Sequence, residues 1–209
     1  MCANFKTVSP QQCSQLSLPF PDFDYPEEIY PGSECPIIFK SASGLEWRKV
    51  MFGMVPKWSK DSKICRSTYN ARSESVFEKP SFKDAWHNNQ FCLIPAAKIY
   101  EPRYVERNKS ERWAIQQTDD KPFTIAGLYQ IARINGHIIR SMTMLTINAD
   151  NNTLMRQFHK PEDEKRVVVV IPPEYREQWL TGSYQAAPSM LFDLNQRQFK
   201  AYHDPRPPR

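Results

Sequence analysis

The sequence has 209 residues, of which 40% are hydrophobic and 24% are charged, and its formal net charge is +5. This length suits one large domain, and the composition argues against a disordered chain. We find no apolar run of about eighteen residues, so no membrane-spanning helix is expected. The first residues lack the charged start and apolar stretch of a secretory signal, so we expect a cytoplasmic protein.

The five cysteines, at positions 2, 13, 35, 65 and 92, are odd in number and widely spaced. No Cys-x-x-Cys pair or nearby histidine pair accompanies them, which argues against a disulfide framework and against a zinc site. We therefore expect free thiols in a reducing compartment. The positive charge is compatible with binding a polyanion, although many ordinary proteins are equally basic.

Eighteen prolines against six glycines, with aromatic and β-branched runs between them, predict many short strands joined by proline-bearing loops. In chain order, the pattern predicts a helix at 10–16, strands at 36–39 and 47–51, a helix at 81–88, strands at 91–96, 112–116, 123–128 and 138–147, a helix at 151–155, a strand at 166–171 and a helix at 173–180.

These elements predict an α+β fold over 1–209 as a single domain. We expect it to be built on a strongly curved, barrel-like and mostly antiparallel sheet with a few short helices. The tail 203–209 contains three prolines and two arginines, so we expect it to be irregular.

Cys2 directly follows the initiator methionine and is small enough for methionine aminopeptidases to remove Met1. The new terminus would carry an α-amine with a pKa of about 7.7–8.0 beside a thiol, so part of the amine is neutral near pH 7. Such a 1,2-aminothiol can form a Schiff base with an aldehyde and then close through sulfur to a thiazolidine ring. Alternatively, Cys2 is a chance small residue in a floppy terminus.

Several segments follow Cys2 in a fixed order. They are FGMVPKW at 52–58, NARSE at 70–74, the pair Tyr100-Glu101, and the pair Phe158-His159 ahead of Arg166 and a hydrophobic strand. In this order the chain resembles the SOS response-associated peptidase (SRAP) family of abasic-site processing proteins. The resemblance runs from Met1 to about Tyr202, which is nearly the whole chain.

The resemblance implies a protein that recognises an abasic site in single-stranded DNA and links its terminal cysteine to the opened sugar aldehyde. Cys2 matches the family nucleophile, and Asn70 matches the asparagine that holds the terminal cysteine and the sugar. Glu101 matches the glutamate that moves protons during ring closure, and His159 the histidine associated with sugar opening and reversal. The resemblance implies no cofactor and no metal. We expect a monomer in the bacterial cytosol or nucleoid, without a membrane partner.

A basic loop and its surroundings are candidates for DNA binding. The candidates for phosphate contacts are Lys57, Lys60, Lys63, Arg66, Arg72 and Arg166, and Trp58 offers a face for base stacking. Plainer interpretations exist for each site. Asn70 could cap a turn and Arg72 could pair with Glu74. Glu101 and His159 could lie in solvated loops, and Trp58 could belong to the core.

The chain departs from the family pattern in several places. Ala3-Asn4 stand where Gly-Arg is common, which removes an arginine that could contact DNA. Pro102 stands where tryptophan is common, and Val167-Val168 where Met-Pro is common.

Two other functions therefore stay open. One is a cysteine-type peptidase using Cys2, Glu101 and His159, which would include self-removal of Met1. The other is a passive binder of single-stranded or modified DNA.

Overall fold

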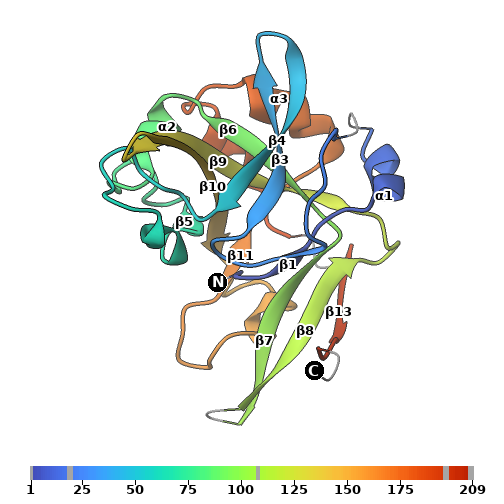
Figure 1. Cartoon of the computed structure of the whole chain (residues 1–209). Helices are drawn as coiled ribbons and strands as arrows, with labels where there is room; N and C mark the ends of the chain where they lie inside the picture. Colours follow the sequence, from blue (N-terminus) through green and yellow to red (C-terminus); the bar gives the residue numbers. More distant parts are fainter. Residues whose placement is uncertain (1, 18–20, 107–108, 195–197, 207–209) are drawn as a thin grey trace.

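The computed structural model describes residues 2–17, 21–106, 109–194 and 198–206, and its strands form two sheets (Figure 1). The strands are β1 (Phe5–Lys6), β2 (Glu28–Ile29), β3 (Glu34–Ser41), β4 (Gly44–Phe52), β5 (Asn70–Arg72), β6 (Phe91–Ala96), β7 (Lys98–Glu106), β8 (Lys109–Gln117), β9 (Phe123–Ile134), β10 (His137–Asn148), β11 (Arg166–Val168), β12 (Val170–Ile171) and β13 (Phe199–His203). The α-helices are α1 (Pro10–Gln15), α2 (Lys83–His87) and α3 (Arg176–Thr181), and the 3-10 helices are η1 (Lys63–Arg66), η2 (Met155–Gln157), η3 (Pro173–Tyr175) and η4 (Ala187–Met190).

The larger sheet contains a closed ring of strands. Its order runs β11-β10-β4-β3-β6-β9-β12, and β9 also pairs with β10, so that β10, β4, β3, β6 and β9 form a barrel. Most of the pairs are antiparallel, while β10 runs parallel to β4 and to β5. The predicted α+β fold on a curved, barrel-like sheet is therefore confirmed.

The sequence explains why the ring closes around a core. All six residues of β6 are buried, and the first six of β9 are buried as well, because both strands face packed layers on two sides. Helix α3 covers β6, where Trp179 Nε1 donates to the carbonyl oxygen of Cys92 at 2.9 Å. Packing in this core therefore fixes the strands from which the neighbouring loops extend.

The smaller sheet brings the start of the chain onto the middle of the molecule. Its order is β13-β8-β7-β1-β2, so β1 lies between β2 and β7. Phe5 is paired with Ile29 on one side and with Ile99 on the other. The β7–β8 hairpin continues beyond β1 and projects away from the barrel (Figure 1).

The predicted strands are confirmed, with the stretch 166–171 divided into β11 and β12. Helices are confirmed in three of the four predicted places, with shifted bounds, and η3 precedes α3 in the last of them. The helix predicted at 151–155 is wrong. There, Asn152 Oδ1 accepts the backbone N–H groups of Leu154 and Met155 at 3.0 Å each, so the chain turns at 152–154 and only the short 3-10 helix η2 follows, from Met155. Of the tail, His203 ends β13, 204–206 are irregular, and 207–209 lie outside the described residues.

Gly53, the second residue of the 52–58 motif, directly follows β4 in a conformation that only glycine adopts easily. Its φ is +109°, and a Cβ atom built there would lie 2.1 Å from the carbonyl oxygen of Cys65. The backbone of the two segments therefore touches, and Thr68 Oγ1 closes the loop by donating to the Met54 oxygen at 2.6 Å. This contact sets the path of the loop that leads to β5.

We expect Gly53→Ala to lower the free energy of unfolding by about 3 kcal/mol or more, because the new methyl group meets backbone. Gly136→Ala is the matched control. It also has a positive φ, of +83°, but nothing lies within 4 Å of the added Cβ, so only strain of about 1–2 kcal/mol is expected. Urea unfolding of both variants checks this, and equal losses would contradict it.

Candidate active site around Cys2

The first residues of the chain are held inside the molecule. The Cys2 side chain is 2% exposed, and Asn70 Nδ2 donates to the Cys2 carbonyl oxygen at 2.8 Å. Asn70 begins β5, which pairs with β10, so the barrel determines where the amide lies. The other atom of that amide, Asn70 Oδ1, is buried and has no hydrogen-bond partner among the described residues. The Asn70 amide thus bonds to a distant part of the chain, and not to its own turn as the alternative interpretation would have it.

Asn4 has a structural part in this arrangement. It is 8% exposed, and its Nδ2 donates to the Ile29 carbonyl oxygen at 3.0 Å, which ties β1 to β2. Its Oδ1 accepts from Arg112 Nη2 at 3.3 Å. Arg112 comes from β8 and also pairs with Glu28. An arginine side chain thus lies beside Asn4. It comes from β8, whereas the family pattern has an arginine at position 4 itself.

The thiol of Cys2 lies in surroundings that keep it protonated. Burial raises the pKa of the Cys2 thiol well above its ordinary value, and the negative charge of Glu101 raises it further. The hydrogen bond with the Asn4 backbone opposes these effects without overcoming them. A neutral thiol needs a base before it can act as a nucleophile, and Glu101 is the carboxylate whose charge acts on this thiol.

Glu101 and His159 form a buried pair beside Cys2. His159 Nε2 lies 2.8 Å from Glu101 Oε2, and the two side chains are 7% and 2% exposed. The His159 N–H donates to the Pro102 carbonyl oxygen at 2.9 Å, and His159 has a φ of +62°. Positive φ is uncommon outside glycine and often marks a functional position. The solvated-loop interpretations of these two residues are therefore wrong.

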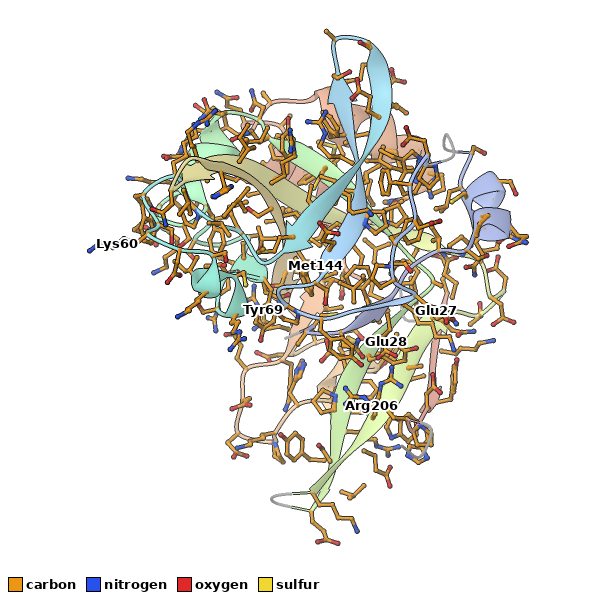
Figure 2. The ribbon with its side chains drawn as sticks, viewed as in Figure 1. Glu27, Glu28, Lys60, Tyr69, Met144 and Arg206 are labelled. Atoms are coloured by element: carbon orange, nitrogen blue, oxygen red, sulfur yellow. The ribbon has the colours of Figure 1, made fainter. Side chains whose placement is uncertain are left out.

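Tyr69 belongs to the same centre, although its sequence position gave no signal for it. It lies near the middle of the molecule in Figure 2, and its carbonyl oxygen accepts from the Met144 N–H at 3.0 Å. Its ring packs edge-on against Phe52, with centroids 5.8 Å apart. Burial raises the pKa of the Tyr69 phenol, and the charge of Glu101 adds to the effect. The phenol is thus a neutral hydroxyl in the neighbourhood of Cys2 and Glu101.

The predicted DNA-binding loop is exposed. Lys57, Lys60, Lys63 and Arg66 all point to solvent and form no ion pair within the described ranges. Lys60 lies at the outer edge of the molecule in Figure 2.

Trp58, on the same loop, is 56% exposed, so the interpretation as a core residue is wrong. Its Nε1 donates to the Pro80 carbonyl oxygen at 3.1 Å, which leaves the ring face accessible.

Two of the predicted cations are engaged with carboxylates. Arg72 is exposed but pairs with Glu164 at 2.8 Å, rather than with Glu74. Arg166 is 3% exposed and contacts Glu74 at 2.7 Å and Glu164 at 2.9 Å. A phosphate could reach its guanidinium only after these ion pairs are broken. The expected phosphate contact of Arg166 is therefore corrected to a structural role in holding the 70–74 motif against β11.

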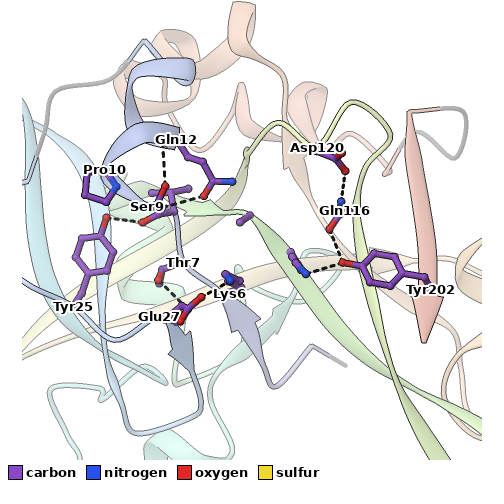
Figure 3. Close-up of a pocket in the computed structure, with 13 residues that line it drawn as sticks. Lys6, Thr7, Ser9, Pro10, Gln12, Tyr25, Glu27, Gln116, Asp120 and Tyr202 are labelled. Carbon is purple, nitrogen blue, oxygen red and sulfur yellow. Dashed lines mark hydrogen bonds and ion pairs between the residues drawn. The ribbon is translucent and has the colours of Figure 1, made fainter. Parts of the chain in front are cut away.

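A separate cavity of about 770 Å³ lies along the other part of β1 (Figure 3). Its polar groups bond mostly to one another. Lys6 pairs with Glu27, while Lys98 Nζ donates to the Tyr202 hydroxyl at 2.6 Å and that hydroxyl donates to Gln116 at 2.8 Å. Neither Cys2 nor Glu101 lines it. Because its polar groups are satisfied internally, this cavity is a weaker candidate than the centre around Cys2.

Among the described residues, no group of three or more His, Cys, Asp or Glu side chains could hold a metal ion. In the same part of the chain, no helix is long and apolar enough to cross a membrane.

The comparisons with known proteins define the class. Residues 1–203 match the family "SOS response associated peptidase (SRAP)", and the chain belongs to that family. Among its relatives is the "Abasic site processing protein YoqW" of Bacillus subtilis (strain 168). It is 28% identical over 164 residues, which cover 78% of this chain and 70% of the relative. A second B. subtilis relative, "Abasic site processing protein YoaM", is 27% identical and is covered over 69% of its length.

Solved structures agree with this assignment. A crystal structure of a protein from Bordetella bronchiseptica has a TM-score of 0.89 and 28% identity, with 97% of this chain and 99% of that chain covered. A protein from Bacteroides thetaiotaomicron has a TM-score of 0.81, with 97% and 91% covered. At 21% identity, this second likeness shows the fold alone.

The ion pair between Arg166 and Glu74 predicts a pH-dependent contribution to stability. Burial opposes ionisation of Glu74, but the hydrogen bonds and charge of Arg166 outweigh it and lower the pKa of Glu74. A lowered pKa stabilises the fold above the pKa of the unfolded chain, and the contribution is lost as the pH falls through the folded-state pKa.

We therefore expect Glu74→Gln to cost roughly 1 kcal/mol at pH 7, a value reduced for the solvent screening of a half-exposed carboxylate. The cost should shrink as the pH falls below about 4. Urea unfolding at pH 7 and pH 3 measures it, with the exposed Glu78→Gln as control. A cost that grows on acidification would contradict the assignment.

Proposed function

We propose that the protein, after loss of Met1, binds abasic sites in single-stranded DNA and joins Cys2 to them covalently. The observation that carries the proposal is the convergence of three groups on one buried cysteine. Asn70 holds its carbonyl at 2.8 Å, and the charge of Glu101, itself bonded to His159 at 2.8 Å, acts on its thiol. The relatives named as abasic site processing proteins support the same substrate.

The reaction would begin at nitrogen. Removal of Met1 frees the α-amine of Cys2, which adds to the C1′ aldehyde of the opened sugar. The carbinolamine then loses its hydroxyl group as water and leaves an iminium. The thiol sulfur adds to the iminium carbon and its proton departs, which closes the thiazolidine. The adduct therefore has the combined mass of protein and DNA minus one water.

The described residues supply the proton transfers that these steps need. Glu101 can accept the thiol proton, and a group that accepts a proton can also return it to the departing hydroxyl. His159, in contact with Glu101, can exchange protons near neutral pH. The unsatisfied Asn70 Oδ1 lies on the amide that already holds Cys2, so it is a suitable acceptor for the new α-amine.

DNA would reach this centre along the exposed loop of Lys57, Lys60, Lys63 and Arg66. The absence of carboxylate partners within the described ranges leaves these cations available to phosphates. Trp58 supplies an exposed ring on which a base next to the lesion can stack. Asn70, whose amide holds the Cys2 carbonyl, follows Arg66 after only a few residues. The loop and Cys2 are therefore linked through Asn70.

We expect mature protein to form a covalent adduct with a single-stranded oligonucleotide that carries an abasic site. Intact mass spectrometry should find protein plus oligonucleotide minus water. Cys2→Ala removes the thiol, and a lysine inserted between Met1 and Cys2 blocks the amine, so neither variant should form the adduct.

The same measurement separates the other two functions. A peptidase would cleave a peptide without an adduct, and a passive binder would retain the DNA without a mass increase. Verified mature protein that forms no adduct would overturn the proposal. An oligonucleotide without the abasic site is the matched control.

Glu101 and His159 should contribute to opposite directions of the reaction. Glu101→Gln should slow adduct formation by about 10²-fold or more, the lower range for loss of a general acid–base group, with little change in noncovalent binding. His159→Ala should mainly slow release of the preformed adduct, because reopening requires protonation of a ring heteroatom.

Formation is measured by quenching at short times, and release by chasing purified adduct with excess competitor. Equal effects of both substitutions on both rates would show that the roles are assigned wrongly. The covalent chemistry itself could still stand in that case, because the adduct experiment tests it separately.

A further inference from the structure

Arg103 lies beside the Glu101–His159 pair, two residues after Glu101 on strand β7. Side chains alternate along a strand, so Glu101 and Arg103 project from the same face of β7. Arg103 also forms a β-bridge with His159, next to the hydrogen bond from the His159 N–H to the Pro102 oxygen. Its side chain is therefore a neighbour of the candidate reactive groups.

The guanidinium of Arg103 is held by an aromatic ring. Its Cζ atom lies 4.4 Å from the centroid of the Trp113 ring, which comes from the paired strand β8. Trp113 is itself fixed, since its Nε1 donates to Glu111 at 3.2 Å and its ring lies 6.3 Å from that of Phe158. A guanidinium stacked by its face keeps its N–H groups free at the edge.

Arg103 has no ion pair among the described residues, in contrast to Arg72 and Arg166. Glu111 is its cross-strand partner, but the Glu111 carboxylate accepts from Trp113 and lies outside ion-pair distance of Arg103. The result is a partly buried cation that lies over an aromatic ring and forms no ion pair with any described residue. Such a group is suited to a ligand that brings a negative charge with oxygen acceptors.

Electrostatics favour a phosphate at this position. An abasic sugar that reaches Cys2 carries a phosphate on each side, and these anions approach the carboxylate of Glu101. At a distance of a few ångströms this repulsion is substantial, because the effective dielectric constant at a protein surface is well below that of water. A cation beside Glu101 would offset it, and the planar guanidinium can bind a phosphate through two hydrogen bonds.

We propose that Arg103, stacked on Trp113, binds a phosphate adjacent to the abasic sugar. The proposal rests on the function proposed above and adds a second DNA-binding surface on the β7–β8 hairpin. The first is the loop of Lys57, Lys60, Lys63 and Arg66, next to β5, and Figure 1 shows that β5 and the projecting hairpin lie on different sides of the N-terminal segment. The DNA strand would pass from one of these two surfaces to the other across Cys2.

Noncovalent binding tests this without requiring the cross-link. The probe is a single-stranded oligonucleotide with a tetrahydrofuran abasic analogue, which has no aldehyde and so forms no adduct. Its affinity is measured at several salt concentrations. Arg103→Gln should lower the affinity about tenfold and reduce the slope of log affinity against log salt by about 0.7, the value for one phosphate.

Two further variants make the result specific. Arg103→Lys keeps the charge but loses the stacked, two-bond geometry, so the salt slope should stay near that of the wild type while the affinity falls a few-fold. Arg133→Gln is the matched control. Arg133 is an exposed arginine whose Nη1 donates to the Gly136 oxygen in the β9–β10 turn, and its removal should change neither quantity.

Methylphosphonates, which remove the charge of a single phosphate, then identify the partner. One such substitution beside the analogue should weaken wild-type binding about tenfold and leave Arg103→Gln binding unchanged, as a double-mutant cycle requires for interacting groups. The proposal is overturned if Arg103→Gln keeps the wild-type affinity and slope, if every methylphosphonate weakens both proteins equally, or if the wild type does not bind. If the protein binds the analogue as expected but forms no adduct with abasic DNA, only the cross-linking function is overturned.

Discussion

The hydrogen bond from Asn70 to the Cys2 carbonyl determines where the chain begins, and the candidate site depends on that position. The ends of most chains are poorly ordered unless something ties them down. Here β1 is paired on both sides, and the Asn70 amide adds a bond of 2.8 Å at residue 2 itself. Without such a constraint, a nucleophile at the end of a chain would be positioned less precisely than one in the middle of a strand.

The barrel supplies that constraint because it joins distant parts of the chain. β5 runs parallel to β10, so the 70–74 motif is fixed by a central strand rather than by its own short loop. Arg166 then holds Glu74 from β11, which pairs with the same strand. His159 reaches the site from a different direction, through backbone contacts with β7. The two sheets therefore meet at Cys2, and each positions part of the candidate site.

The sequence predicted the strands whose β-branched and aromatic residues follow a clear pattern, and it missed the short strands β1, β2, β5 and β13 as well as the long strand β7. Pro102 lies within β7, and a proline inside a strand pattern argues for a loop. The structure accommodates it beyond the end of β1, where β8 is the only described strand that pairs with β7. The order of the family motifs led to Cys2, Asn70, Glu101 and His159, which the structure brings together. Arg166 was misjudged because sequence gives no sign that Glu74, far away in the chain, neutralises it. Tyr69 and Arg103 were missed because only the fold places them beside the candidate site.

The burial of Cys2 has a consequence for the order of the proposed chemistry. A thiol whose pKa is raised by burial and by Glu101 is a poor nucleophile at neutral pH, so sulfur should not attack first. The α-amine loses its charge at a much lower pH, but it exists only after Met1 has been removed. Formation of the iminium then places an electrophilic carbon beside the thiol, and its positive charge offsets the carboxylate that had kept the thiol protonated. The same surroundings that hold the thiol inactive before the amine reacts would therefore favour its attack afterwards.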